Sequence, residues 1–478
     1  MKSLVAGNWI DSSDGNVIQV INPATNELVD TVPSLTKEDI DKAVDAAYTA
    51  QKEWAKTSVV ERCNILSKFA SLVLRDKDSL AKLLSDETGK PIKEAVNEIA
   101  NIQVGVPAYV EKVKHDYGNV IHRGTEAGQE NTIQYTVQQP LGVVVAIIPF
   151  NFPSDIFINK VPPALLMGNS VILKPASVNP LTLTKYVSLL VEAGVPSGVI
   201  SVVHGSGSVV GKALTSNPKV DMVTLTGSTA AGIDAAKNCA DHCAHSSLEL
   251  GGNDAFIICA DGDIDLAVEE TVWGRLYNAG QVCCASKRFL VENSVKDEFI
   301  AKMIEKIKTL KVGMPASLTT DIGCLISEEA AIEVENQIKQ TVAEGAKIVF
   351  GGQRKGAFIA PTIIDGITKD MAVAKDMEIF GPVISVIGFD TIEEAVEIAN
   401  QSMYGLSAGI ITRDMNKAFK VSEQVESGGF VVNGASFFRS FEQPFGGWKY
   451  SGIGNEGIMS TLREMSRTKT VILKNIIK

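Results

Sequence analysis

The feature that most constrains the fold is a regular alternation between apolar runs and helical segments across residues 141–258. The runs, rich in β-branched side chains, are LGVVVAIIPF, SVILKP, VISVVHG, MVTLTG and SLELGG. Because their apolar character is nearly continuous, they suit parallel strands that are covered by helices on both faces. The sequence therefore predicts a doubly wound α/β sheet in this region.

Each apolar run ends in a polar or glycine-rich turn. These turns contain Asn151, Lys174, residues 205–207, residues 227–232 and residues 249–252. In open parallel sheets, ligands bind outside the carboxyl ends of the strands. We therefore expect the candidate chemistry to gather along one edge of the sheet.

A second α/β pattern begins after Gly252 and predicts a second domain of similar architecture. Its segments are DAFIICADGDIDLAVEE, KRFLVENSVKDEFIAKMIEKI, AKIVFGG, VISVIGF, LSAGIIT and GGFVVNG. A length of 478 residues, at roughly 150 residues per domain, agrees with two or three lobes. Residues 119–138 are polar with strand-like pieces and indicate an excursion from the main body. The tail TKTVILKNIIK predicts a strand that pairs with this excursion or with a partner.

Local signals refine the N-terminal part. NVIQVINPATNELVDTV predicts strand structure. Thr36 with Asp39 forms a capping-box pattern ahead of a helix, and Gly89-Lys90-Pro91 predicts a helix end.

Charge, hydropathy and cysteine usage exclude several classes of partner. The net charge of −11, with no lysine/arginine tract, argues against nucleic acid, whose binding depends on clustered cations. No apolar run approaches the roughly 20 residues of a membrane span, and the start MKSLVAGNWIDSSDG is too polar for a signal peptide. Seven cysteines without regular spacing indicate reduced thiols in a cytoplasmic protein.

The stretch AGQVCCASKR places Cys283 and Cys284 between a helical segment and the apolar run KRFLV. A thiolate attacks carbonyl groups well, but a thiol with a pKa near ~8.5 must be activated by its surroundings. The alternative is a buried cysteine that packs as a small hydrophobe. A cysteine peptidase would also need a histidine partner. No local signature of one accompanies the histidines, which are His115, His122, His204, His242 and His245.

Three further groups could act in a site. Glu249, in LELGGND, is either a helix-capping carboxylate or a general base. In TGSTAAG, Gly227 and Ser228 open a helix whose free amides could bind a phosphate, although this is not the usual dinucleotide fingerprint. In VILKPAS, Lys174 lies at a strand end with Ser177 three residues on, and a lone lysine is normally a solvated cation.

One cluster superficially offers zinc ligands: Cys239, His242, Cys243 and His245. Residues 239, 242 and 243 share a helical face but residue 245 does not. No second set follows at finger spacing, so we expect no metal site.

Seven motifs, in order, resemble those of the NAD(P)-dependent aldehyde dehydrogenase superfamily, from about residue 5 to residue 475. They are PFNFP, VILKPAS, LTGSTAAG, LELGGND, GQVCC, MEIFGPV and PFGGWKYSGIGNEG. The resemblance implies two doubly wound parallel-sheet domains and a small β arm. It assigns residues 1–118 and 140–250 to a cofactor-binding Rossmann-like domain, residues 251–450 to a catalytic domain, and residues 119–139 and 451–478 to an oligomerisation arm. A homodimer or homotetramer is implied.

The resemblance also implies a mechanism. The family nucleophile follows Gly-Gln-x, which selects Cys283 and leaves Cys284 as a neighbour that packs or suffers oxidation. The oxyanion would be held by the Asn151 amide and the Cys283 backbone amide, and such a donor generally contributes about 10²- to 10³-fold in rate. Glu249 would activate water against a thioester, which favours a free acid product.

For the cofactor, the resemblance places Lys174 on the adenosine ribose, the Ser228 region at the pyrophosphate, and Glu378 with Phe380 near the nicotinamide ribose. Strict NAD users often carry a glutamate where this chain has Ser177. Because a serine does not repel a 2′-phosphate, we expect NADP to be accepted beside NAD. The implied cofactor residues are Pro149, Phe150, Lys174, Ala176, Ser177, Gly207, Gly211, Gly227, Ser228, Leu250, Gly251, Glu378 and Phe380.

The implied substrate residues are Arg439, Phe152 and Cys284. Arg439 could bind a carboxylate, phosphate or sulfonate on a short aldehyde, or it could form a surface ion pair with Glu442. Succinate semialdehyde dehydrogenases of bacteria typically have an arginine where this chain has Asn159, which counts against that substrate.

We therefore expect oxidation of a small polar aldehyde, similar to lactaldehyde or glycolaldehyde, or of a short semialdehyde. Succinate semialdehyde and, without phosphorylation, glyceraldehyde-3-phosphate are the alternative substrates. A cofactor-independent thiol esterase or acyltransferase is the alternative of another class. A non-catalytic relative is disfavoured because Asn151, Glu249 and Cys283 are all intact.

Overall fold

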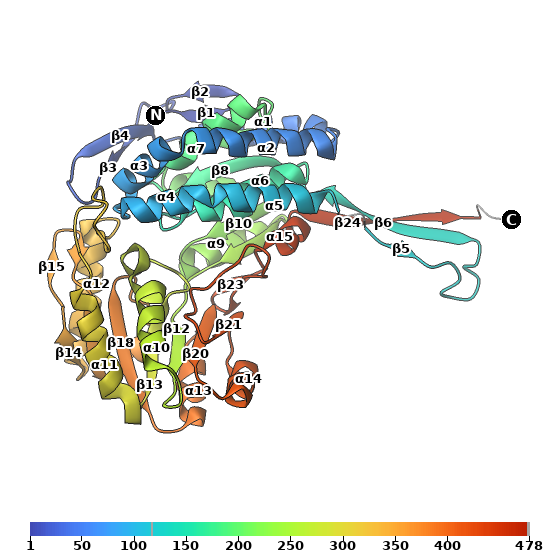
Figure 1. Ribbon diagram of the computed structural model, residues 1–478. Helices are drawn as coiled ribbons and strands as arrows, with labels where there is room; N and C mark the ends of the chain where they lie inside the picture. The colour runs from blue at the N-terminus through green and yellow to red at the C-terminus, as the bar shows by residue number, and fades with distance from the viewer. Residues whose placement is uncertain (116–117, 476–478) are drawn as a thin grey trace.

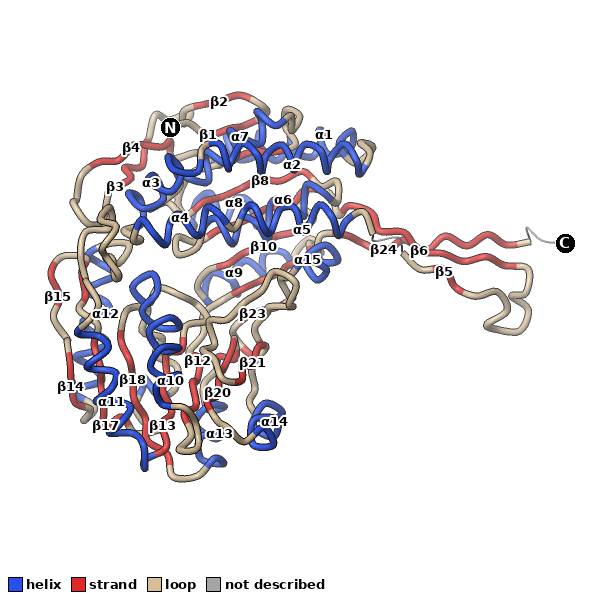
Figure 2. The backbone as a smooth tube through the Cα atoms, in the orientation of Figure 1, coloured by secondary structure: helices blue, strands red, loops and turns tan. Residues whose placement is uncertain are grey.

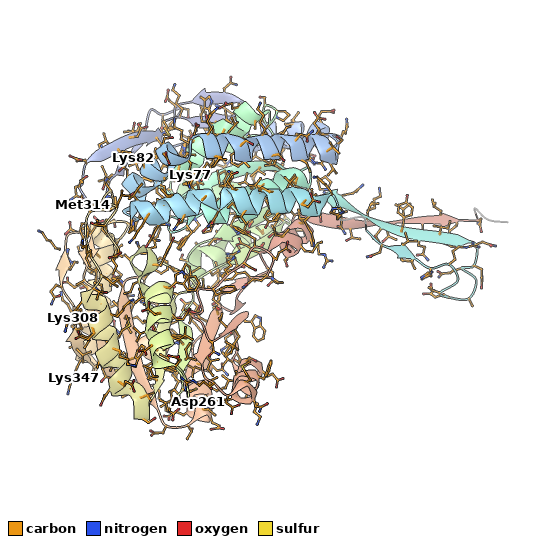
Figure 3. The ribbon with its side chains drawn as sticks, viewed as in Figure 1. Lys77, Lys82, Asp261, Lys308, Met314 and Lys347 are labelled. Carbon is orange, nitrogen blue, oxygen red and sulfur yellow. The ribbon has the colours of Figure 1, made fainter. Side chains whose placement is uncertain are left out.

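The computed structural model describes residues 1–115 and 118–475. It contains two α/β lobes and a β arm that projects from the first lobe (Figure 1; Figure 2). Charged side chains cover the outside of both lobes, for example Lys82 on the first lobe and Lys308 on the second (Figure 3). Residues 116–117 of the predicted cofactor-binding domain and residues 476–478 of the predicted arm lie outside the described residues.

The first sheet has a parallel centre with antiparallel strands at its edges. Its order is β2-β1-β9-β8-β7-β10-β11-β23, and the strands from β9 to β11 run parallel. The parallel strands derive from the apolar runs, so the doubly wound prediction is confirmed. In this order, the strands are Asn8–Ile10, Ser3–Val5, Ile200–Val202, Ser170–Pro175, Val143–Ile148, Met222–Thr226, His245–Glu249 and Gly452–Ile453.

Helices cover both faces of this sheet, which explains the continuous apolarity of its strands. Along β7, Val143 and Val145 pack with α1 and α9, whereas Val144 and Ala146 pack on the opposite face with α2, α6 and α7. The helices of this lobe are α1 (Lys37–Trp54), α2 (Val59–Arg75), α3 (Lys77–Thr88), α4 (Ile92–Ala100), α5 (Ile102–Val113), α6 (Pro153–Leu166), α7 (Leu181–Ala193), α8 (Lys212–Thr215), α9 (Thr229–Ala240) and α15 (Ile458–Glu464), with a π-helical turn at Gly207–Gly211.

The local signals near the N-terminus have the predicted effects. Thr36 and Asp39 form a capping box at the start of α1. Helix α3 ends at Thr88, followed by Gly89 in the left-handed conformation with φ 76°. The expected strand region forms the hairpin of β3 (Val17–Ile21) and β4 (Leu28–Pro33).

The second lobe repeats the architecture with the strand order β14-β17-β18-β13-β12-β20-β21, in which only the pairing of β14 with β17 is antiparallel. In this order, the strands are Lys347–Phe350, Thr362–Ile367, Val383–Phe389, Ser286–Glu292, Asp254–Ile258, Ser407–Ile411 and Gly429–Val432. The helices of this lobe are α10 (Ile264–Thr271), α11 (Asn293–Lys308), α12 (Glu328–Ala343), α13 (Ile392–Asn400) and α14 (Met415–Gln424). Two short antiparallel pairs lie outside the main sheet. They are β15 (Arg354–Lys355) with β16 (Phe358–Ile359), and β19 (Tyr404–Gly405) with β22 (Trp448–Lys449). In the described part of the chain, no helix is long and apolar enough to cross a membrane.

The arm is an antiparallel sheet in which β6 (Thr132–Pro140) lies between β5 (Val120–Ile121) and β24 (Ser466–Lys474). The C-terminal strand therefore pairs with the polar excursion. The prediction assigned residues 451–478 to this arm, and here the structure differs. Strand β23 pairs with β11 of the first sheet, and α15 packs against α5 and α6. The arm's C-terminal strand begins only at Ser466, because the apolar face of α15 is buried in the first lobe.

Candidate active site

A cavity of about 410 Å³ opens where the carboxyl ends of β7, β8 and β10 face the second lobe. Residues from both lobes line it, with Asn151 and Lys174 on one side and Cys283 on the other. It brings together residues that are far apart in the sequence. The predicted site residues that line it are Pro149, Phe150, Asn151, Lys174, Ala176, Gly227, Ser228, Leu250, Gly251, Cys283, Glu378 and Phe380.

A second cavity of about 710 Å³ continues from the first along the edge of the sheet. Lys174 lines both cavities, and Gly207 and Gly211 line the second. Ser177 lines neither cavity, and its hydroxyl donates to the Gly205 carbonyl at 3.0 Å. Together the two cavities form a groove with small residues on its floor.

Lys174 lies in this groove, and no carboxylate among the described residues pairs with it. Its ammonium donates to the Pro175 carbonyl at 3.3 Å, and burial lowers the pKa of Lys174 to about 8. A buried cation without a counter-ion is costly. A bound anionic or hydroxyl-rich ligand would therefore complete the surroundings of this ammonium.

The turn that carries Cys283 depends on an unusual backbone. Asn278 and Ala279 have φ values of 50° and 52°, and Gly280 follows with φ 77°. A Cβ at Gly280 would lie 2.2 Å from the Gly381 carbonyl oxygen, so only glycine fits there. Gln281 then fixes the turn, because its side-chain oxygen accepts from the Ile326 amide at 2.9 Å.

The two adjacent cysteines have different surroundings. Cys283 is half-buried and lines the cavity, whereas Cys284 is buried against apolar side chains that include Leu406 and Phe445. A hydrogen bond from the Cys284 thiol lowers the pKa of Cys283, opposed by burial and aided by the charge of Lys287. The same hydrogen bond, together with burial, raises the pKa of Cys284. Of the two thiols, Cys283 is therefore the one that loses its proton more readily.

Asn151 follows β7 and is held through its backbone. Its carbonyl accepts from the Lys90 ammonium at 2.8 Å and from the Asn278 side-chain amide at 3.0 Å. Lys90 is in turn paired with buried Glu98. Within the described residues, the Asn151 side-chain oxygen has no hydrogen-bond partner. The fixed backbone thus leaves the side-chain amide uncommitted beside Cys283.

Glu249 ends β11 and is buried. Both of its carboxyl oxygens lack a hydrogen-bond partner in the described part of the chain, so it caps no described helix. Burial, followed by the nearby Glu456 carboxylate, raises the pKa of Glu249 well above its usual value, whereas Arg439 opposes the shift. The charge of Cys283 also raises the pKa of Glu249, but less than burial and Glu456 do.

Arg439 pairs with Glu456 and not with Glu442, which corrects the ion-pair alternative. Its Nη2 lies 2.8 Å from Glu456 Oε2, and the guanidinium stacks over the Phe445 ring at 4.1 Å. The other Glu456 oxygen lies 2.8 Å from the Lys160 ammonium. Arg439 lines neither cavity of the groove. Arg439 therefore already has a carboxylate partner within the protein, which it shares with Lys160.

Aromatic rings form a wall beside the nucleophile. Phe152 packs in the same apolar cluster as Cys283 and stacks on Tyr277 at 6.1 Å between ring centroids. Phe437 lies 5.5 Å from Tyr277 and 4.8 Å from Trp273. Phe437 also packs in the apolar cluster that contains Cys283, so the wall borders the nucleophile.

Comparison with known proteins agrees with this geometry. The model of the aldehyde dehydrogenase family matches residues 9–471. The chain belongs to the aldehyde dehydrogenase family. A lactaldehyde dehydrogenase of Methanococcus maripaludis (strain C5) is 38% identical over 476 residues, with 99% of this chain and 100% of the relative covered. A 3-sulfolactaldehyde dehydrogenase of Priestia aryabhattai is 38% identical over 469 residues, with 98% and 97% covered. A solved betaine aldehyde dehydrogenase from Staphylococcus aureus, in complex with NAD+, superposes with a TM-score of 0.95 at 33% identity, with 100% of this chain and 95% of that chain covered.

As an aldehyde dehydrogenase, the protein is an oxidoreductase that acts on aldehydes with NAD or NADP. The groove fits such a cofactor. The buried Lys174 ammonium lacks a counter-ion among the described residues, and Gly251 brings its backbone close to Glu378, since a Cβ there would lie 2.7 Å from a Glu378 carboxyl oxygen. Ser228 caps α9, which directs backbone amides toward the groove.

Several residues of this aldehyde dehydrogenase site were missed from the sequence. Lys160, Lys287 and Glu456 are buried charged residues, and Tyr277 and Phe437 belong to the aromatic wall. The motif ending in GNEG contains Glu456, which was the only available signal. A lysine in a sequence looks the same whether it is buried or solvated.

The candidate zinc cluster is dispersed in the structure. Cys239 lies on the buried face of α9, and His245 pairs with Glu464 at 2.5 Å. Among residues 1–115 and 118–475, no group of three or more His, Cys, Asp or Glu side chains is arranged to hold a metal ion.

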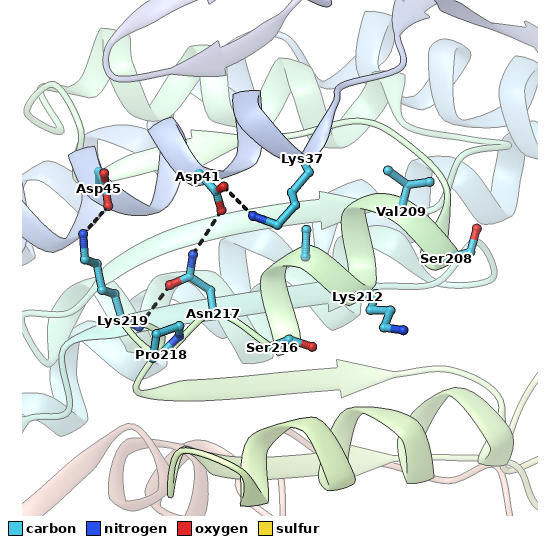
Figure 4. Close-up of a pocket in the computed structure, with 11 residues that line it drawn as sticks. Lys37, Asp41, Asp45, Ser208, Val209, Lys212, Ser216, Asn217, Pro218 and Lys219 are labelled. Atoms are coloured by element: carbon cyan, nitrogen blue, oxygen red, sulfur yellow. Dashed lines mark hydrogen bonds and ion pairs between the residues drawn. The ribbon is translucent and has the colours of Figure 1, made fainter.

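Another cavity, of about 740 Å³, lies on the outer side of the first lobe beside α1 and α8 (Figure 4). Most of its charged side chains are paired with one another, because Lys37 pairs with Asp41 and Lys219 pairs with Asp45, both at 2.6 Å. None of its lining residues is a cysteine. It is not the reaction site.

Proposed function

We propose that the protein oxidises a small polar aldehyde to the free carboxylic acid through a thioester on Cys283. The observation that carries this proposal is the pairing of a half-buried thiol of lowered pKa with an uncommitted Asn151 amide in one cavity. The buried Glu249 carboxyl group supports hydrolysis of the thioester as the second half of the reaction.

In the first half, the Cys283 thiolate adds to the aldehyde carbon and forms a thiohemiacetal. The negative charge moves to the former carbonyl oxygen, where the Asn151 amide and the Cys283 backbone amide can donate hydrogen bonds. As this oxyanion collapses, the C–H bond breaks and its electron pair leaves as hydride. NAD or NADP, when bound in the groove, would supply the acceptor for that hydride.

In the second half, Glu249 takes a proton from water, and the resulting hydroxide adds to the thioester carbon. The C–S bond breaks, the acid leaves, and the Cys283 thiolate is restored. Glu249 must be ionised for this step. Burial and Glu456 raise the pKa of Glu249, whereas the positive charges of Arg439 and Lys160 lower it. The two cations therefore favour the ionised form that acts as the base.

For the cofactor, we assign the groove residues by their chemistry. Lys174 would contact the adenosine ribose or its phosphate, and the α9 start at Ser228 would contact the pyrophosphate. Glu378 and Phe380 would hold the nicotinamide end beside Cys283. The absence of a carboxylate at Ser177 supports acceptance of NADP as well as NAD.

For the substrate, we favour a small uncharged hydroxyaldehyde such as lactaldehyde or glycolaldehyde. Arg439 is already paired with Glu456 and lines neither cavity of the groove, which weakens its role as a receptor for an anionic substrate. Asn159, the position that argues against succinate semialdehyde, is buried and accepts a hydrogen bond from Tyr109 at 3.0 Å. The names of the lactaldehyde and 3-sulfolactaldehyde relatives support a three-carbon aldehyde.

The mechanism is tested by trapping the thioester. Glu249→Gln, mixed with lactaldehyde and NADP or NAD and then quenched in acid, should carry one acyl group on the Cys283 peptide by mass spectrometry. Cys283→Ala should carry none and form no reduced cofactor. Acylation of another residue, or turnover by Cys283→Ala, would overturn the proposed function. The same assay run with sulfolactaldehyde and succinate semialdehyde ranks the substrates.

A further inference from the structure

Lys287 is a buried lysine whose ammonium contacts several parts of the site. It is the second residue of β13, and its side chain is 1% exposed. Its Nζ donates to the Cys283 carbonyl at 2.5 Å and lies 3.1 Å from Glu378 Oε1. It also lies 5.8 Å from the centre of the Phe380 ring. One cation therefore contacts the turn of the nucleophile and Glu378, and it lies near Phe380, the other second-lobe residue assigned to the nicotinamide end.

The groups around Lys287 compensate its burial. Asp254 lies on the neighbouring strand β12, is buried, and has one carboxyl oxygen without a partner in the described chain. Burial raises the pKa of Asp254, and the charge of Lys287 opposes that shift. The Glu378 carboxylate accepts only one further hydrogen bond that the structure gives, from the Gly252 amide at 3.4 Å. Lys287 is thus the main polar support of Glu378.

The Cys283 turn is also anchored from this side. Lys287 binds the Cys283 carbonyl, and the Ser436 hydroxyl donates to the Cys284 carbonyl at 3.0 Å. Strand β13 lies between β12 and β18 at the centre of the second sheet. A side chain rooted in a central strand holds its partners more rigidly than one on a loop.

We propose that Lys287 is a positioning residue that fixes the Cys283 turn and, with the same ammonium, holds Glu378 where the nicotinamide ribose binds. This inference rests on the proposed function, because it takes Cys283 as the nucleophile and Glu378 as a cofactor residue. Its consequence is that removal of one charge changes thiol reactivity and cofactor affinity together. A residue that only filled space would change neither in a charge-dependent way.

The test measures Cys283 alkylation by iodoacetamide across pH, without aldehyde or cofactor, and the dissociation constants of NAD and NADP by protein fluorescence. In Lys287→Met, we expect the alkylation midpoint to rise by about one pH unit, which is about tenfold slower reaction at neutral pH. Cofactor affinity should fall by about tenfold, because Glu378 loses its counter-ion. Exposed Cys243, followed in the same peptide digest, is the internal reference and should react unchanged.

Lys287→Gln separates the two roles, because its amide can still donate to the Cys283 carbonyl but carries no charge. We expect its cofactor affinity to fall as in Lys287→Met, with a smaller shift of the alkylation midpoint. This variant also serves if Lys287→Met does not fold. Lys296→Met is the matched control. Lys296 lies on α11 in the same lobe and pairs with Asp365 at 2.8 Å. This substitution should leave the alkylation midpoint and the cofactor affinity at parent values.

An alkylation midpoint in Lys287→Met equal to that of the parent, or parent cofactor affinity in Lys287→Gln, would overturn the inference. Neither readout requires turnover. Failure of the proposed function appears separately, as the absence of an acyl group on Cys283 in Glu249→Gln.

Discussion

Ser177 is the residue at which we expect NAD and NADP to be distinguished. In Ser177→Glu, a carboxylate would repel the 2′-phosphate of NADP, while it could accept hydrogen bonds from the free ribose hydroxyls of NAD. We expect the NADP/NAD ratio of kcat/KM to fall by at least about tenfold, or ~1.4 kcal/mol. Initial rates with both cofactors measure it. Ser177→Ala loses the bond to Gly205 without adding charge and should alter the ratio far less; an unchanged ratio in Ser177→Glu would refute the explanation.

Glu249 makes hydrolysis of the thioester dependent on pH. Because burial raises the pKa of Glu249, a larger fraction is protonated at neutral pH than for an exposed glutamate, and only the ionised form is a base. Single-turnover hydrolysis of the acyl-enzyme should therefore accelerate as pH rises through that raised pKa. In Glu249→Gln, hydrolysis should be about 10²- to 10⁴-fold slower and should lose this dependence. A parent rate that is flat from acid to alkaline pH would contradict the role.

The same shift links Glu249 to stability. The folded protein favours the protonated form, so the contribution of Glu249 to stability is present at low pH and is lost as pH rises through its folded-state pKa. At high pH, burial of the ionised Glu249 lowers the free energy of unfolding. The protein retains this buried carboxyl group because the proposed reaction needs it.

At the scale of elements, the segment from η2 (Val272–Leu276) through η3 (Tyr277–Gly280) determines where the nucleophile lies. In Gly280→Ala, the added Cβ would meet the Gly381 carbonyl oxygen at 2.2 Å and would occupy a left-handed backbone. We expect a loss of about 1–3 kcal/mol in stability, measured by denaturant unfolding, together with slower Cys283 alkylation.

Gly356→Ala is the control for that prediction. Gly356 has φ 58°, but no atom lies within 4 Å of its added Cβ. Gly356→Ala therefore introduces a strained backbone but no steric clash, so alkylation of Cys283 should stay at the parent rate. Equal effects of the two substitutions would show that the approach of Gly280 to Gly381 has no special importance.

The elements that the sequence predicted well are those with a strong local pattern. The runs around Val143–Ile148 and Met222–Thr226 became parallel strands because helices bury both of their faces. The conformation of the Cys283 turn could not be predicted, because Ala279 adopts a left-handed backbone that no local preference favours. The burial of Lys287 and Lys160 was also hidden, since it depends on carboxylates far away in the sequence. Motif spacing alone could not show that Arg439 would be paired with Glu456.

At the scale of the whole molecule, the arm exposes apolar side chains that we expect a second copy to cover. Val120 is 79% exposed and Ile472 is 55% exposed. We expect light scattering to give the mass of a dimer or tetramer, and Val120→Asp/Ile472→Asp to shift the protein toward smaller species. Val60→Asp, on α2 at 63% exposure, should leave the mass unchanged. A monomeric parent would contradict the assembly.

Because β23 pairs with β11, the N-terminal half of the chain alone does not complete the first sheet. Roughly 200 residues separate these strands, and at about 5–20 residues per second a ribosome needs on the order of 10–40 s to make them. During that interval, the edge of β11 and the surface of α5 and α6 that α15 will cover stay exposed in the nascent chain. A strand made about 200 residues after β11 thus completes the first sheet, and a chain truncated before β23 would leave the edge at β11 unpaired.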